Sequence, residues 1–256
     1  MSSARRRGRF LWLVLPVLAM ALAIWACGST PAISHQDAAH LRLTITFTAQ
    51  YTGNTDTALV DVRIYDTTNN QLVFAPTNAH LTCEGADVKP NYQRFMRECP
   101  RQPAGGAYRF VYTDEHGIVT TVVIPVPRGT VALLAPRPDD RVAIPANNAL
   151  AIRYRVPTAG PDGSVTMDEV RALALCGETA APPCGEVTFG KPFTTGEAVI
   201  GGDGVFQLRG DFSSFQPKPG MVDMTISVHV SPSQSGFARV DATFTDSVAA
   251  PITWKR

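Results

Sequence analysis

The 256-residue sequence predicts an all-β fold, with two antiparallel β-sandwich domains behind an N-terminal signal or anchor helix. Three observations support this prediction. From residue 40 onward, apolar and polar residues alternate, which is the period of a strand with one buried face. Twenty glycines and twenty prolines are scattered along the chain, which indicates many turns and few long helices. Hydrophobic residues make up 45% of the chain, enough to form a core.

The first 26 residues have the pattern of a targeting segment. Four arginines lie within the first nine residues, and seventeen uncharged residues follow at 10–26. Positive charge is retained on the cytoplasmic side while the apolar run enters the bilayer. A helix of that length rises about 26 Å, slightly less than a hydrocarbon core of about 30 Å. The segment is therefore either an export signal or a short membrane anchor.

Ile24-Trp25-Ala26-Cys27 resembles the lipobox of bacterial lipoproteins, in which an aliphatic, a variable and a small residue precede the cysteine. The resemblance implies that Cys27 is diacylated on sulfur, that the signal peptide is cut before it, and that residues 27–39 form a tether. The alternatives are an uncleaved N-terminal transmembrane helix and a released protein. All three place the rest of the chain at or beyond the cell membrane, facing outside the cytoplasm.

Alternation predicts the individual strands in order along the chain. The predicted strands are 41–51, 59–65, 108–113, 118–124, 150–156, 221–230 and 239–245. Asp114-Glu-His-Gly117 predicts a hairpin loop closed by glycine. Residues 168–175 fit either a strand or a short helix. Residues 84–98 show little alternation, so we expect a long connection there.

Pro125–Thr130 is the best boundary, and it divides the exported part into 40–128 and 129–256. Each part is large enough for its own core. At the level of strand pattern, both resemble the immunoglobulin-like modules of bacterial surface lipoproteins. That resemblance implies a fold and no particular function.

Four cysteines remain after Cys27, an even number that favours disulfides in an exported chain. Spacing favours the two local bonds, Cys83–Cys99 and Cys176–Cys184. A disulfide that closes a fifteen-residue loop stabilises a fold by about 3 kcal/mol. The alternative, a four-cysteine zinc site, needs closer pairs than these.

Charge excludes one class of partner. Without the four leader arginines, 19 of the 23 Lys+Arg remain against 22 Asp+Glu, so the exported part carries about −3. We therefore predict no nucleic-acid binding.

No catalytic, cofactor or metal residues are predicted, because no motif brings candidates together. The candidates considered are His35, His40, His80, His116, His229, Asp139-Asp140, Asp168-Glu169, Asp203, Ser233-Gln-Ser-Gly236, the tripeptide Arg209-Gly210-Asp211 and the two-proline loop from Cys176 to Cys184. Asp203 between glycines is a turn residue, or one ligand of a calcium site assembled from several loops. The tripeptide is interpreted as a strand end, and the loop as a structural staple.

These observations predict a membrane-tethered, extracytoplasmic module that is not an enzyme. It would bind a protein or glycan outside the cell, or support an envelope complex. The alternative is an extracytoplasmic hydrolase whose site is assembled from distant loops. The sequence does not identify the ligand.

Overall fold

The computed structural model describes residues 38–53, 55–73, 79–88, 90–91, 94–175, 183–189, 197–199 and 201–256. Within these residues a short 3-10 turn, η1 (Ala38–His40), is followed only by strands, so the all-β class is confirmed. The first eight strands are β1 (Leu41–Thr48), β2 (Thr57–Asp66), β3 (His80–Cys83), β4 (Ala86–Val88), β5 (Pro90–Asn91), β6 (Arg94–Pro100), β7 (Ala107–Thr113) and β8 (Val119–Pro125). The remaining strands are β9 (Ala132–Ala135), β10 (Arg141–Ala143), β11 (Ala149–Val156), β12 (Ser164–Ala174), β13 (Gly185–Phe189), β14 (Glu197–Val199), β15 (Gly202–Arg209), β16 (Pro219–Val230), β17 (Gln234–Ser235) and β18 (Arg239–Lys255).

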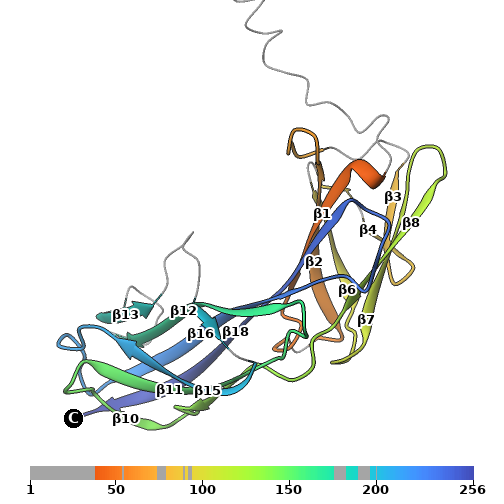
Figure 1. Cartoon of the computed structure of the whole chain (residues 1–256). Helices are drawn as coiled ribbons and strands as arrows, with labels where there is room; N and C mark the ends of the chain where they lie inside the picture. Colours follow the sequence, from red (N-terminus) through yellow and green to blue (C-terminus); the bar gives the residue numbers. More distant parts are fainter. Residues whose placement is uncertain are drawn as a thin grey trace, which may run out of the picture.

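These strands form three sheets. A ten-stranded sheet has the order β13-β12-β16-β18-β1-β2-β6-β5, with β10 also paired to β18 and β14 to β12. A five-stranded sheet has the order β17-β8-β7-β3-β4, and a three-stranded sheet the order β15-β11-β9. Figure 1 shows two lobes joined at an angle. We call β1–β8, β17 and the first part of β18 lobe 1, and β9–β16 and the rest of β18 lobe 2.

The last strand, β18, belongs to both lobes. Its first residues run parallel to β1, from Arg42↔Arg239 to Thr48↔Thr245. From residue 242 to residue 253 it runs antiparallel to β16, so one sheet continues from lobe 1 into lobe 2 (Figure 1). Even-numbered residues of β18 face the core in both lobes, among them Phe244 and Trp254. The two smaller sheets therefore cover the same face of the large sheet.

Lobe 1 is built around an aromatic cluster. The Phe47 ring stacks on Phe244 with centroids 4.3 Å apart, and it lies 4.5 Å from Tyr108 and 6.0 Å from Phe110. Phe47 and Phe244 come from the ten-stranded sheet, and the other two rings from β7 of the five-stranded sheet. The cluster is fully buried, so these contacts hold the two sheets face to face.

Lobe 2 is built around Trp254. Its indole Nε1 donates a hydrogen bond to the Leu173 carbonyl at 2.9 Å, and its ring meets Phe215 edge-on at 5.0 Å. Gly220 on β16 lies beneath this ring, and a β-carbon there would come 2.1 Å from Nε1. Glycine is therefore required at this position so that the tryptophan can lie against the sheet.

Several expectations are confirmed and others need correction. The 107–113/119–125 hairpin forms, with Gly117 in the left-handed region at φ 79°, and residues 168–174 are strand rather than helix. Residues 84–98 are not a plain connection, because they contain β4, β5 and most of β6. Met96 and Arg97 are both half-buried, so β6 lacks a clear alternation of buried and exposed residues, and the sequence pattern does not predict this strand.

The pairing pattern also differs from the expected one. β18 pairs in parallel with both β1 and β10, so the sheets are not wholly antiparallel. β1 ends at Thr48 rather than continuing to Tyr51, because Ala49 takes a left-handed φ of 59°.

The predicted boundary at 128/129 lies in the linker between the lobes, and residues 234–245 return to lobe 1. The expected N-terminal helix lies outside the described residues.

Candidate functional site

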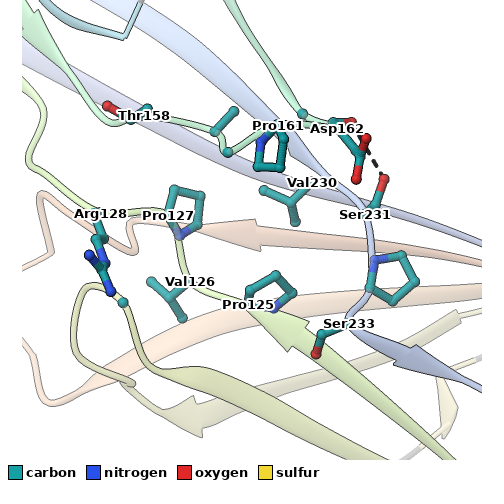
Figure 2. Close-up of a pocket in the computed structure, with 15 residues that line it drawn as sticks. Pro125, Val126, Pro127, Arg128, Thr158, Pro161, Asp162, Val230, Ser231 and Ser233 are labelled. Atoms are coloured by element: carbon teal, nitrogen blue, oxygen red, sulfur yellow. Dashed lines mark hydrogen bonds between the residues drawn. The ribbon is translucent and has the colours of Figure 1, made fainter.

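A groove with a volume of about 490 Å³ lies where the lobes meet (Figure 2). Four chain segments line it: Gly105 in the turn between β6 and β7, the linker after β8, the turn between β11 and β12, and the turn after β16. The lining residues used below are Pro125, Val126, Pro127, Arg128, Thr158, Pro161, Asp162, Val230, Ser231, Pro232 and Ser233. Its volume lies within the range of small-molecule and peptide sites, which often occur between domains.

Proline and glycine fix the backbone of the groove. Four of the lining residues are prolines, which lack an N–H and hold φ near −65°, so the strands end there. The linker is held on both sides, because Val126 exchanges backbone hydrogen bonds with residues 105 and 106, and Thr158 N donates to the Arg128 carbonyl at 2.9 Å. Gly129 has φ 112° and lies against Pro157, where a side chain would be strained. The groove is therefore a rigid feature of the junction.

The groove has an apolar floor and a polar rim. Val126 and Val230 are buried in the floor, whereas Arg128 and Asp162 are exposed at the rim. Figure 2 shows these two charged residues at opposite ends of the groove. Neither forms an ion pair with any residue in the described part of the chain. A ligand with an apolar body and separated charges fits this arrangement.

A smaller hollow of about 250 Å³ shares part of this lining. Asp162, Gly163, Val230 and Ser231 border both hollows. The smaller one is otherwise lined by Ser164 at the start of β12 and by residues of β16 and β18, including His229. The β11–β12 turn therefore contributes to both.

A partly buried polar cluster connects the groove to β18. Tyr51 donates its hydroxyl to the Pro127 carbonyl at 3.2 Å, and its backbone N–H donates to Asp246 Oδ1 at 3.1 Å. Thr52 donates its N–H and its hydroxyl to the same oxygen at 3.0 and 2.7 Å. Burial, followed by the nearby Asp246 carboxylate and Tyr108, raises the pKa of the Tyr51 phenol. Burial likewise raises the pKa of the Asp246 carboxyl, and these hydrogen bonds offset part of the rise.

One predicted disulfide is present. Cys83 on β3 and Cys99 on β6 are bonded, fully buried and have Cα atoms 6.1 Å apart. Cys184 is also disulfide-bonded, but Cys176, its expected partner, lies outside the described residues. The expected lipidation site Cys27 lies outside them as well.

The other sequence candidates are dispersed. His40 ends η1, His80 is exposed on β3, His116 lies in the β7–β8 turn, His229 is exposed on β16 with Nδ1 3.0 Å from Thr243 Oγ1, and His35 lies outside the described residues. Asp203 accepts two hydrogen bonds from Arg155, of 2.6 and 2.9 Å, so the guanidinium occupies the position that a calcium ion bound to this carboxylate would take. Among the described residues no group of three or more His, Cys, Asp or Glu is arranged to hold a metal ion.

The remaining motifs have structural roles. Gly210 of the tripeptide packs on Val187, where a β-carbon would lie 2.3 Å from Cγ1, and Asp211 accepts the Ser213 amide at 2.8 Å in a local turn. Asp168 accepts hydrogen bonds from the hydroxyls of Thr166 and Ser227 on the sheet. The segment 233–236 contains β17 and lies along β8.

The sequence predicts a domain boundary at Pro125–Thr130 but no groove there. Nothing in the segments 158–163 and 230–233 indicates that they lie beside this boundary. A cluster of prolines at three strand ends was the one available signal.

None of the helical segments within the described residues has the length and apolar character to cross a membrane. No protein-family model matches this sequence, and a comparison with curated proteins finds no similar chain.

Proposed function

We propose that this chain is a lipid-anchored extracytoplasmic protein that binds a protein or glycan partner, or supports an envelope complex, without catalysing a reaction. The observation that carries the proposal is the lipobox-like Ile24-Trp25-Ala26-Cys27 ahead of a disulfide-bonded β structure. A buried disulfide such as Cys83–Cys99 is typical of chains that fold in an oxidising compartment outside the cytoplasm.

Within this proposal the two lobes are immunoglobulin-like β-sandwiches. Alternating strands with one buried face support it, as does the packing of a smaller sheet against each part of the ten-stranded sheet. Such lobes present rigid surfaces and connecting turns, which suits recognition of a partner.

The junction groove is the proposed binding site. Its apolar floor supplies surface to bury, and Arg128 and Asp162 supply separated charges for orientation. The hydrolase alternative has less support, because the groove rim combines one arginine, one aspartate and serines without a histidine.

Fatty-acid labelling in cells tests the anchor. The wild-type protein should incorporate an alkyne-tagged fatty acid and sediment with membranes, whereas Cys27→Ser should lose the label. Ser29→Ala is the matched control and should keep it. Unchanged labelling of Cys27→Ser would refute lipidation at Cys27, and an intact mass that includes residues 1–26 would indicate an uncleaved helix instead.

Site-specific photo-cross-linking tests the groove. A benzoylphenylalanine introduced at exposed Thr158 should give discrete adducts in cells, whereas the same group at Val205, 60% exposed on β15, should not. Identical adducts from the two positions would contradict the groove as the binding site.

A further inference from the structure

Two large apolar side chains are exposed together at one end of lobe 1. Ile118 is 60% exposed and Val119 61%, and they are consecutive at the tip of the β7–β8 hairpin. Isolated exposed apolar residues are common on protein surfaces. An adjacent pair at the tip of a rigid hairpin has a geometry suited to insertion into another phase.

Backbone N–H groups at the hairpin tip are hydrogen-bonded within the turn itself. The Asp114 carboxylate accepts the N–H groups of His116 and Ile118, both at 2.8 Å. Asp114 N donates to the Ile118 carbonyl at 3.0 Å, and Gly117 N donates to the Asp114 carbonyl at 3.1 Å. Unpaired backbone groups make entry into lipid costly, and this turn has already paired these four.

The chain enters lobe 1 at the same end as this tip. Ala238 N donates to the Ala38 carbonyl at 3.2 Å, and the preceding residue, Phe237, packs its ring 5.7 Å from Tyr112 on β7. Gly236 lies on Thr120, where a β-carbon would be 2.6 Å from Cγ2. Figure 1 shows the β8 end of the hairpin and η1 at the same end of lobe 1, away from lobe 2.

The anchor is close to this end in sequence. Ten residues separate Cys27 from Ala38. Even a fully extended chain of that length spans only about 36 Å, so an anchor at Cys27 keeps this end of lobe 1 near the bilayer. A weak contact then acts at high effective concentration.

We propose that the β7–β8 hairpin tip inserts Ile118 and Val119 into the lipid surface to which Cys27 is anchored. This rests on the anchor of the proposed function. A lipid on a flexible tether holds the protein at the membrane without fixing its orientation, and a second hydrophobic contact on the folded lobe would fix it. Lobe 1 would then lie next to the membrane, and lobe 2 would project away from it. Asp114 and Glu115 make the tip acidic, so neutral lipid is the appropriate partner.

Depth-dependent quenching tests the orientation on the full-length acylated protein. Ile118→Cys and Val205→Cys are each labelled with the fluorophore NBD, since the other described cysteines are disulfide-bonded. The proteins are reconstituted in phosphatidylcholine vesicles that contain nitroxide-labelled lipid. Val205 is the matched control, because it is equally exposed but lies in lobe 2. Val119→Cys provides a second label site at the tip.

We expect labels at 118 and 119 to lose roughly half or more of their emission, and the label at 205 to keep its emission. Protein that floats with the vesicles while the labels at 118 and 205 respond alike overturns the inference and leaves the anchor intact. Quenching at 205 alone also overturns it. Protein that does not float with the vesicles overturns the anchor, and this inference with it.

Discussion

Lobe 1 and lobe 2 each pack a smaller sheet against part of the same large sheet, but different contacts hold them closed. Lobe 1 has a disulfide between its two sheets and a cluster of four aromatic rings. In lobe 2 the core packs around Trp254, which is two residues before the last residue of the sequence. Because β18 supplies Phe244 to one core and Trp254 to the other, neither lobe is complete without the strand that enters its neighbour.

The largest expected effect comes from removing the central residue of lobe 2. Trp254→Ala removes a fully buried ring and a buried hydrogen bond, so it should lower the free energy of unfolding by about 3–5 kcal/mol. Urea unfolding followed by circular dichroism measures this. Trp254→Phe keeps most of the buried area and should lose less. A loss within 1 kcal/mol for the alanine variant, by the same scale, would contradict the role of this ring.

Removing the lobe 1 disulfide should have the next largest effect. Cys83→Ala/Cys99→Ala opens a link between residues 16 apart, and the expected loss is about 3 kcal/mol. Hydrogen exchange should increase most in β3–β6, the strands nearest the bond. An unchanged unfolding midpoint, or faster exchange mainly in lobe 2, would show that the bond does not hold lobe 1 closed.

Asp246 at the junction should make stability depend on pH. Burial raises its pKa above the ordinary value of 3.8, so the folded state binds this proton more tightly than the unfolded state. The contribution is therefore fully present below pH 3.8 and is lost as pH rises through the raised pKa. Asp246→Asn cannot ionise and should gain stability relative to wild type as pH rises, by less than the disulfide contributes. A constant difference across pH would refute this assignment.

The exposed ion pair of lobe 2 should have the smallest effect. Arg155 and Asp203 are about half exposed, so solvent and salt screen their attraction. Arg155→Gln should leave the unfolding midpoint unchanged within error at physiological salt. A fall of several degrees would show that this outer face of lobe 2 is covered by something other than solvent.

Local alternation predicted the strands whose two faces differ clearly. β1, β7, β11 and the hairpin turn at 114–117 follow from residue pattern alone. β12 was ambiguous because its register shifts between Met167 and Glu169, and the shift breaks the period of two. The parallel pairing of β1 with β18 joins residues about 200 apart, and no local pattern specifies such a partner.

The candidate site was less predictable than the fold for the same reason. Pro125 and Pro127 indicate a strand end, but their position beside Pro161 and Val230 depends on how the lobes share β18. Asp246 lies on the even-numbered, core-facing side of β18, one residue beyond the predicted strand 239–245, so the strand pattern did not include it. The turn at 49–52 packs over it and supplies its hydrogen bonds, and no local pattern predicts that contact.

Calorimetry of the Trp254→Ala variant tests most directly whether the shared strand unites the lobes. The account predicts one transition for wild type, with equal calorimetric and van't Hoff enthalpies, because β18 couples both cores. Trp254→Ala should move that whole transition to lower temperature, including the loss of structure in lobe 1. Two transitions, of which the substitution moves only one, would contradict the account and show that the lobes unfold independently.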